Sequence, residues 1–292
     1  MYLVRQTSLP DHKMDRVIMP DHKMGKVIIV GAGVFGLSAA LIISQRWPNL
    51  QISIVDKPSR NAPSQDISKI VRIDYNNEPW MIEALEARRR WISGPFAEFQ
   101  RTVGRIVIHD KDDFSTLLDI DDTRTKLGLP TRQRGDEKLM QDKFPTTNAP
   151  PSLTYVSAPD DMIVDWAPCM SKAMERARQA CTDSGGIFYE SGVETIIKKA
   201  SHITALVLEN GEEINADNAQ VVLAVGPWLT QVLATSDIRL PPNERKPVAT
   251  GLFSYTVQLD KEQAKYFRDK PVVSHNGTGQ SFSADPFILH TG

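Results

Sequence analysis

The spacing of apolar residues near the start of the chain predicts a strand, a helix and a second strand. In KVIIV (26–30), four consecutive β-branched residues without alternation are typical of a strand covered on both faces. GLSAALIISQRW (36–47) combines small and aliphatic residues and predicts a helix, and LQISIVD (50–56) predicts a strand that ends on an acid. Together the three segments predict a βαβ unit.

A second group of apolar segments, between residues 187 and 226, predicts a series of strands. The segments are IFYES, VETII, ITALVLENGEEINA and QVVLAVG, and Asn210-Gly211 in the third is a strong signal for a hairpin turn. This part of the chain is therefore expected to continue with strands and not with further helical crossovers.

The first 23 residues are expected to form a loose tail. The phrase LPDHKMDRVI recurs at once as MPDHKMGKVI, and only the second copy leads into the first predicted strand, so Met24 would be a natural start. No apolar stretch follows the basic residues of this tail, and a secretory signal or membrane anchor is therefore not expected.

Composition narrows the classes of function. The 34 Lys and Arg nearly balance the 36 Asp and Glu without a basic stripe, which argues against nucleic acid and anionic membranes as partners. The longest apolar runs contain glycines, so no membrane span is expected. Cys169 and Cys181 lack CxxC spacing and the histidines lack ligand spacing, so neither a disulfide framework nor a metal site is predicted.

The turn GAGVFG after the first strand has the residues of a dinucleotide site. Gly31 permits a tight turn, Gly33 lets the backbone approach a pyrophosphate, and Gly36 allows close packing of helix on strand. The helix N-terminus then faces the phosphates. Asp56, 20 residues beyond Gly36, is placed to accept hydrogen bonds from a ribose diol. The alternative is a tight turn beside a charged strand end. The predicted site also includes Val34, Phe35 and Lys57.

The choice between a nicotinamide and a flavin cofactor depends on the strands predicted between residues 187 and 226, because nicotinamide-binding Rossmann domains usually continue with more helical crossovers. VVLAVGPW (221–228) is an apolar strand that leads into Ala224, Gly226 and Trp228. With the strands before it, this motif resembles the glutathione-reductase-like FAD-binding fold of the D-amino-acid-oxidase superfamily. The resemblance implies FAD as cofactor and an α/β fold: a Rossmann domain with an antiparallel meander, and an interleaved α+β substrate domain. It also implies that Val193, in GVETI, pairs its backbone with the adenine.

The motif PSQDISKIVRIDY (63–75) narrows the resemblance. It is similar to the segment against the flavin ring in monomeric sarcosine oxidases, fructosyl amino acid oxidases and fungal saccharopine or pipecolate oxidases. The resemblance implies that Lys69 lies close to the isoalloxazine and that Arg72 binds the substrate carboxylate, and these two are the predicted catalytic residues. The alternative for both is a solvated face. Ser68 is included in the predicted cofactor site, although Asp66 and Ser68 are typical of turn caps.

By resemblance, the expected reaction is oxidation of the C–N bond of an amino acid derivative, with oxygen reduced to hydrogen peroxide. Sarcosine or another N-methyl amino acid, a fructosyl amino acid, pipecolate and saccharopine remain open as substrates. The alternatives are a flavin dehydrogenase that passes electrons to a carrier, an NAD(P)-dependent dehydrogenase, and a non-catalytic flavin-binding remnant. The remnant is considered because the chain stops at GQSFSADPFILHTG, where the family continues, so a C-terminally truncated chain is expected.

The expected domains are interleaved. Residues 24–95 and 155–235 are predicted to form the FAD-binding domain, and residues 96–154 and 236–292 the substrate domain. The expected partners are a small amino acid derivative and oxygen, and a monomer is expected. The predicted location is intracellular, cytoplasmic or peroxisomal, although the chain has no C-terminal SKL-type tripeptide.

Overall fold

The computed structural model consists of two compact units, each built from two segments of the chain. Unit 1 comprises Met1–Pro58 and Glu175–Ala249, and unit 2 comprises Ser59–Met174 and Thr250–Gly292. The residues that the structure describes are 25–57, 62–67, 69–110, 114–145, 153–200, 202–239, 247–249, 257–275 and 281–282. The predicted tail and Ser68 lie outside these residues. The boundaries of these two units differ from those of the predicted FAD-binding and substrate domains. The division into these two functional domains stays a prediction.

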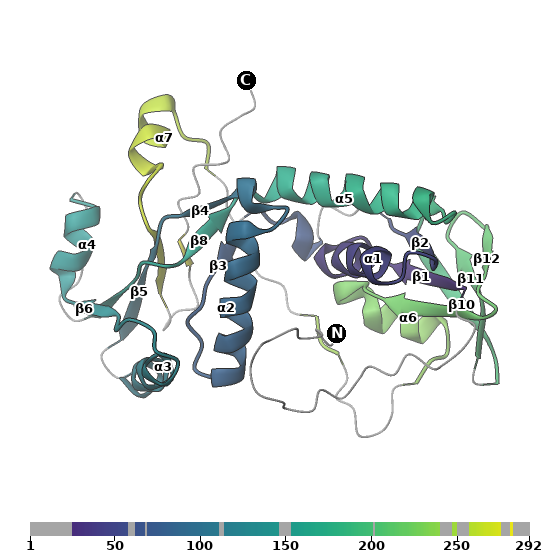
Figure 1. Ribbon diagram of the computed structural model, residues 1–292, viewed down its shortest axis with the longest axis horizontal. Coiled ribbons are helices and arrows are strands. Elements are labelled where there is room, and N and C mark those ends of the chain that lie inside the picture. The colour runs from purple at the N-terminus through teal and green to yellow at the C-terminus, as the bar shows by residue number, and fades with distance from the viewer. Residues whose placement is uncertain are drawn as a thin grey trace. The chain divides into compact units, whose positions relative to one another are not determined.

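Unit 1 contains the predicted βαβ unit. Its elements are β1 (Lys26–Val30), α1 (Val34–Arg46), β2 (Gln51–Val55), the last part of α5 (Trp166–Asp183), β9 (Phe188–Tyr189), β10 (Val193–Lys199), β11 (His202–Leu208), β12 (Glu213–Asn215), β13 (Ala219–Leu223), η3 (Gly226–Trp228) and α6 (Leu229–Thr235). Helix α1 begins two residues before its predicted start, because Gly33 takes the N-cap. Figure 1 shows α1 beside β1 and β2, the two strands that it contacts.

A parallel sheet forms the centre of unit 1. Its strand order is β13-β1-β2-β9, and β1 pairs in parallel with both β2 and β13. Residues Val27 to Val30 are at most 4% exposed, as expected for a parallel strand covered on both faces. The predicted α/β class with a Rossmann-like sheet is therefore confirmed.

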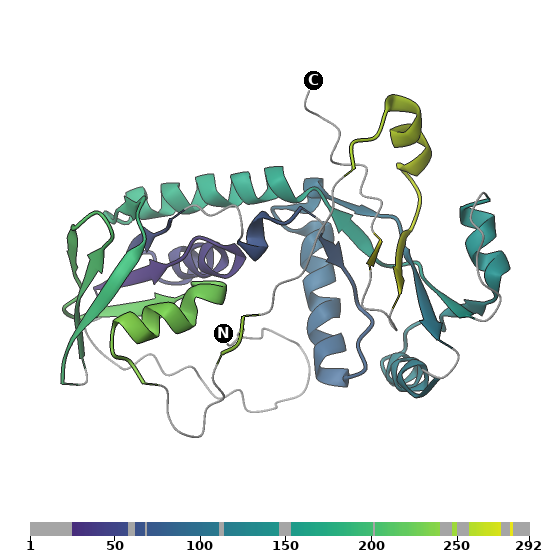
Figure 2. The ribbon, with the colours of Figure 1, turned by 180° about the vertical axis from the view of Figure 1, so that it is seen from behind.

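The predicted meander is a second, antiparallel sheet of unit 1. Its order is β10-β11-β12, and the hairpin between β11 and β12 contains Gly211 at φ 84°, with Asn210 Oδ1 accepting from the N–H of Glu212. Leu206, Leu208 and Ile214 pack with Ile28 and Val55 in one buried cluster. This cluster joins the meander to the parallel sheet, and Figure 2 shows the two sheets side by side from behind.

Unit 2 combines two sheets with helices. Its elements are η1 (Pro63–Gln65), β3 (Ile70–Val71), α2 (Glu78–Ser93), η2 (Ala97–Phe99), β4 (Gln100–Thr102), β5 (Arg105–Asp110), α3 (Phe114–Lys126), β6 (Gln133–Gly135), α4 (Glu137–Lys143), β7 (Leu153–Ala158), β8 (Met162–Val164), the first part of α5, α7 (Lys261–Phe267), β14 (Val272–His275) and β15 (Ser281–Phe282). The larger sheet has the order β15-β14-β5-β7-β6, and the smaller one has the order β3-β8-β4. Strand β14, from the second segment of the chain, pairs with β5, from the first segment, and so joins the two segments in one sheet.

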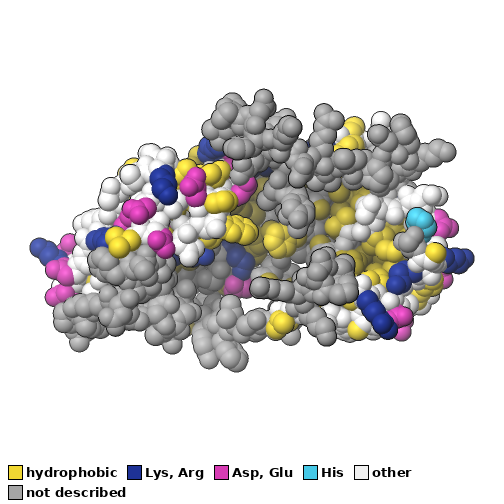
Figure 3. Space-filling model, turned by 90° about the horizontal axis from the view of Figure 1, so that it is seen from below, with side chains coloured by type: hydrophobic (Ala, Val, Ile, Leu, Met, Phe, Trp, Pro, Cys, Tyr) yellow, Lys and Arg dark blue, Asp and Glu magenta, His cyan; other side chains and the backbone are white. Residues whose placement is uncertain are grey.

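Large apolar side chains remain exposed in both units, and Figure 3 shows hydrophobic surface on one face. Phe35 of unit 1 is 61% exposed and Trp80 of unit 2 is 65% exposed. In the described part of the chain, no helix has the length and apolar character needed to cross a bilayer.

Candidate functional site

Three glycines shape the turn between β1 and α1, each in a different way. Gly31 has φ 100°, which favours glycine, and a Cβ on it would lie 2.5 Å from the carbonyl oxygen of Ala224. A Cβ on Gly36 would overlap the carbonyl oxygen of Gly31. Gly33 has φ −71° and ψ −178°, which any residue adopts. The backbone conformation of Gly33 therefore does not require glycine. The predicted role of this glycine is to let a pyrophosphate approach the backbone closely.

Asp56 holds the glycine turn from the end of β2. Its Oδ1 accepts a hydrogen bond of 2.8 Å from the backbone N–H of Ala32, and the N–H of Gly31 donates to the carbonyl oxygen of Val55 at 2.7 Å. Burial raises the pKa of the Asp56 carboxyl, while the Ala32 N–H and the charge of Arg178 act in the opposite direction. Because Oδ1 is engaged by the turn, Oδ2 is the oxygen suited to a ribose hydroxyl.

The surroundings of the turn fit an extended anionic ligand with aromatic parts. The first turn of α1 has no acidic residue, so no carboxylate there offsets the partial positive charge of the helix N-terminus. Phe35 is 61% exposed in that turn, and Trp228, after the neighbouring strand β13, is 37% exposed. Gly226 has φ 54°, and this conformation turns the chain from β13 into η3. These features are compatible with the predicted dinucleotide site at the carboxyl ends of β1 and β13.

A rim of charged residues lies near the predicted adenosine end. Val193 is half-buried at the start of β10 and packs against the cluster that joins the two sheets. Lys57, predicted to contact the cofactor, forms an ion pair of 2.5 Å with Glu209. A Cβ on Gly192 would lie 2.5 Å from Glu209 Oε1, so the glycine leaves room for this carboxylate. Glu209 was not predicted from the sequence, because it lies far from Lys57 along the chain and no motif links the two residues.

Lys69 in unit 2 has two close neighbours. Its Nζ lies 2.6 Å from Asp66 Oδ2 and 5.7 Å from the centroid of the Trp166 ring. The indole N–H of Trp166 donates to the carbonyl oxygen of Ser64 at 2.7 Å, and the carbonyl of Lys69 accepts from Val164 N–H at 3.1 Å. These contacts fix the segment on which the Lys69 ammonium is presented.

Arg72 follows β3 and is exposed. Its guanidinium carbon lies 4.6 Å from the centroid of the Tyr75 ring, which is a cation–π contact. Within the described residues, no carboxylate lies at ion-pair distance from Arg72, although most other arginines of unit 2 have one. The predicted binding of a substrate carboxylate by Arg72 is thus compatible with the described residues.

A buried network of charges supports unit 2, and sequence reasoning missed it. Arg124 Nη1 lies 2.6 Å from Asp74 Oδ1, and Arg132 lies 3.4 Å from Asp74 Oδ2 and 2.7 Å from Asp121 Oδ1. Burial raises the pKa of Asp121, but hydrogen bonds and charge from Arg132 and Arg134 outweigh it, so the net pKa is lowered. These residues lie too far apart in the sequence to show a pattern.

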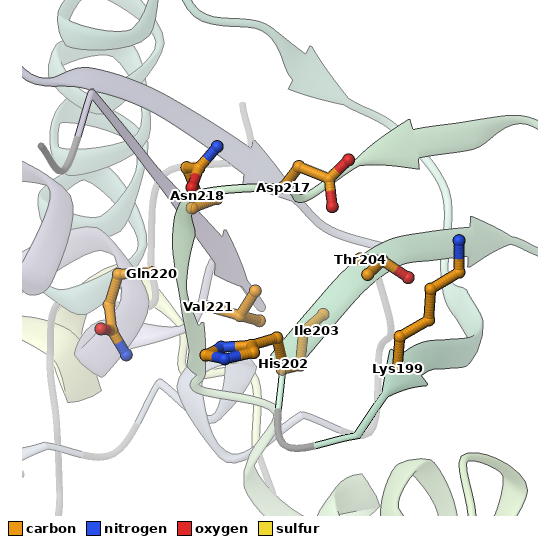
Figure 4. A pocket seen from close by; sticks show the side chains of 9 residues that line it. Lys199, His202, Ile203, Thr204, Asp217, Asn218, Gln220 and Val221 are labelled. Atoms are coloured by element: carbon orange, nitrogen blue, oxygen red, sulfur yellow. The ribbon is translucent and has the colours of Figure 1, made fainter.

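A hollow of about 640 Å³ occurs elsewhere in unit 1 (Figure 4). Its lining includes Lys199 at the end of β10, His202 at the start of β11, and Asp217 and Gln220 near the start of β13. Because Ala219 pairs with Lys26 at the first residue of β1, this hollow lies at the amino ends of the parallel strands. It is therefore at the opposite end of the sheet from the glycine turn.

Comparison with protein families decides the class of this dinucleotide site. The family model described as "FAD dependent oxidoreductase" matches residues 26–282, which covers both units. The chain belongs to this family. The cofactor of the family is FAD, which removes the reason for an NAD(P)-dependent alternative and confirms the predicted flavoprotein class.

Curated relatives of this FAD-dependent chain are amino acid oxidases. It is 27% identical over 288 residues to L-saccharopine oxidase of Schizosaccharomyces pombe, which covers 89% of this chain and 62% of that protein. It is 37% identical over 95 residues to amino acid oxidase fsqB of Aspergillus fumigatus, 27% of this chain and 18% of that protein. The chain thus spans 62% of the length of the saccharopine oxidase.

Solved structures of flavoprotein oxidases share the fold. A modified fructosyl peptide oxidase from Aspergillus nidulans, in complex with FSA, gives a TM-score of 0.65 at 18% identity over 86% of this chain and 60% of that one. NikD, an amino acid oxidase essential for nikkomycin biosynthesis, gives a TM-score of 0.57 at 18% identity over 71% of this chain and 52% of that one. At this identity the likeness shows the fold alone.

Within the family assignment, the individual site residues stay predictions. The predicted unit 1 set lies just after β1, β2 and β13, in the first turn of α1, in η3 and at the start of β10: Gly31, Gly33, Val34, Phe35, Gly36, Asp56, Lys57, Val193, Ala224, Gly226 and Trp228. Lys69 and Arg72 lie together on one segment of unit 2. In the described ranges, no group of three His, Cys, Asp or Glu could hold a metal ion.

The two cysteines are buried on α5. Burial raises the pKa of the Cys169 thiol and of the Cys181 thiol to about 11. Because the thiolate is the reactive form, neither side chain is suited to covalent chemistry at neutral pH.

Proposed function

We propose that the protein binds FAD at the carboxyl ends of β1 and β13 and oxidises the C–N bond of an amino acid derivative, with oxygen reduced to hydrogen peroxide. The observation that carries the proposal is the glycine turn held by the Asp56 carboxylate, in a chain that belongs to the FAD dependent oxidoreductase family. The amino acid oxidases among its relatives support the reaction class.

Each part of the cofactor has residues suited to it. The backbone at Gly33 and the N-terminus of α1 suit the pyrophosphate, and Asp56 Oδ2 suits a ribose hydroxyl. The backbone of Val193 is proposed to pair with the adenine. When bound, FAD would accept a hydride from the carbon next to the amine nitrogen while the nitrogen loses a proton, and the two electrons and two protons would then reduce oxygen to hydrogen peroxide.

Arg72 is proposed to bind the substrate carboxylate. A guanidinium forms two parallel hydrogen bonds with a carboxylate, which fixes the orientation of the substrate as well as holding it. Fixing the reacting carbon in this way lowers the entropy cost of the reaction. Lys69 is proposed to supply positive charge where negative charge develops on reduction, and its pairing with Asp66 holds the ammonium in place.

The proposed substrate class is a small amine that carries a carboxylate. The names of two relatives point to saccharopine and to fructosyl amino acids or peptides, and sarcosine, other N-methyl amino acids and pipecolate complete the set to be tested. The proposal includes oxygen as second substrate, a monomeric protein, and an intracellular location, cytoplasmic or peroxisomal. The two buried, unpaired cysteines accord with a reducing compartment.

The cofactor part is tested by the visible absorption spectrum of the purified chain, before and after acid precipitation. Flavin bands are expected in the native protein, and the flavin should be released to the supernatant. A colourless protein that also fails to bind added FAD would overturn the proposed cofactor site.

The substrate part is tested by peroxide release from the five amines named above. Arg72→Met is expected to raise the apparent Michaelis constant at least tenfold, while flavin content stays unchanged. Arg89→Met is the matched control, because Arg89 is exposed on α2 and pairs only with Glu86 among the described residues. Bound FAD without peroxide release from any amine would favour a flavin-binding protein without oxidase activity.

A further inference from the structure

The Arg72 guanidinium lies over the aromatic ring of Tyr75. The guanidinium carbon of Arg72 lies 4.6 Å from the centroid of the Tyr75 ring, and the two residues share the short segment that follows β3. Arg72 itself is exposed, whereas Tyr75 is half-buried. The aromatic ring therefore forms a support on which an otherwise mobile side chain rests.

The segment that carries this pair is fixed on both sides of Tyr75. Ile73 is 2% exposed, and the carboxylate of Asp74 lies 2.6 Å from Arg124 and 3.4 Å from Arg132 in the buried network. Asn77 caps α2 by accepting from the N–H of Trp80. With buried neighbours before Tyr75 and a helix cap after it, the ring has a defined position.

A cation–π contact attracts the guanidinium to the aromatic ring and requires no carboxylate partner. The five N–H donors of arginine point outward in the plane of the group, where a carboxylate binds bidentately. The ring thus restricts the side chain without placing a competing acceptor at these donors. By contrast, an ion pair with a neighbouring carboxylate would occupy the same donors that a ligand needs.

We infer that Tyr75 is a positioning residue, which holds the Arg72 guanidinium so that its edge receives the carboxylate of the substrate. The inference rests on the proposed binding of that carboxylate by Arg72. Its distinct consequence is that the aromatic ring of Tyr75 matters and its hydroxyl group does not. Tyr75→Phe should therefore behave as the unaltered protein, and Tyr75→Leu should not.

Unit 2 offers a matched control for loss of an aromatic ring beneath a cation. On α7, Tyr266 lies beneath the Lys270 ammonium, also at 4.6 Å, and Tyr266 is 43% exposed. Tyr266→Leu removes the same side chain from the same kind of contact, away from the segment of Arg72.

The experiment uses the 292-residue chain with FAD added and has two readouts. The first is the NMR order parameter of the Arg72 Nε–Hε bond, which reports side-chain restriction without any ligand. The second is the dissociation constant of pipecolate, with piperidine as the probe that lacks the carboxylate. In Tyr75→Leu we expect the order parameter to fall from roughly 0.8 to below about 0.6, and pipecolate binding to weaken about two- to fivefold. Tyr75→Phe, Tyr266→Leu and the affinity for piperidine should remain unchanged.

The outcomes separate this inference from the proposed function. If Arg72→Met weakens pipecolate binding and Tyr75→Leu changes neither readout, the role of Tyr75 is overturned while that of Arg72 stands. If Arg72→Met binds pipecolate as tightly as the unaltered chain, both roles are overturned. Tyr75→Met, a second variant without the ring, decides the matter if the amide spectrum of Tyr75→Leu shows loss of the fold.

Discussion

The two units place their candidate site residues by different physical means. In unit 1 the glycine turn depends on close backbone packing of Gly36 against Gly31 and on one carboxylate, that of Asp56, which accepts from the Ala32 N–H. In unit 2 the segment of Arg72 is held by charged side chains, with Asp74 buried between Arg124 and Arg132. A turn of the first kind depends on a few spaced glycines, whereas the second kind depends on partners brought together by folding.

Burial of polar residues follows the same division. Among the described residues, the buried Asp and Arg all belong to unit 2, and they are Asp74, Arg105, Arg124, Arg132 and Asp161. The buried polar residues described in unit 1 are serines: Ser53, Ser191 and Ser236. Removal of one partner from a buried ion pair leaves an uncompensated charge. Unit 2 should therefore be the more sensitive of the two to changes of charge.

The largest expected effect is that of Asp74→Asn. This change removes the carboxylate nearest to the buried guanidinium of Arg124, leaving Asp160 at 3.9 Å, and should lower the free energy of unfolding of unit 2 by about 3–5 kcal/mol. Hydrogen exchange should show the loss of protection in peptides of unit 2, with unit 1 spared. Arg90→Met, which breaks an exposed pair with Glu86, is the control. Equal loss of protection in both units would contradict the comparison.

Gly33→Val should weaken FAD binding by unit 1 without destabilising the fold of this unit. The φ of −71° at Gly33 is open to valine, so hydrogen exchange of unit 1 should change little. A side chain at this position should nevertheless block the approach of a pyrophosphate and weaken FAD binding by about 100-fold or more. Titration of the chain with FAD measures this, with Gly25→Val as control, because a Cβ on Gly25 would meet no atom within 4 Å. Retained FAD affinity would remove Gly33 from the site.

Asp121 should make the stability of unit 2 depend on pH. The pKa of Asp121 is lowered in the folded chain, so its carboxylate adds stability above the unfolded value of 3.8, and this is lost as pH falls through the folded pKa. Asp121→Asn should lower the free energy of unfolding by roughly 1.5–3 kcal/mol at pH 7. The difference between variant and unaltered chain should shrink as urea unfolding is repeated at lower pH below 3.8. A difference that is constant with pH would indicate a packing effect.

The smallest expected effect is that of Lys57→Met in unit 1. The ion pair of Lys57 with Glu209 is exposed, and such pairs contribute about 0–1 kcal/mol to stability. Urea unfolding should therefore change little. FAD titration tests the predicted contact of Lys57 with the cofactor: a loss of affinity smaller than that of Gly33→Val is expected, and unchanged affinity would remove Lys57 from the predicted site.

Much of unit 1 could be predicted from the sequence because its signals are local. The apolar run at 26–30, the glycine spacing and Asp56 fall within about thirty residues, and Asn210-Gly211 specifies its own hairpin. The pairs Lys57–Glu209 and Asp74–Arg124 could not be predicted, because each joins distant segments that have no pattern of their own. Asp66 was interpreted as a turn cap, and its carboxylate also binds the Lys69 ammonium.

The place of β1 between β2 and β13 has a consequence for synthesis on the ribosome. β2 follows β1 closely, but β13 emerges only after the whole first segment of unit 2 has been made. Until then, the nascent chain exposes one edge of an apolar strand that can pair with the wrong partner or with another chain. Non-local pairing of this kind is slow to form, so a fragment that ends before residue 219 should depend on chaperones and should aggregate without them.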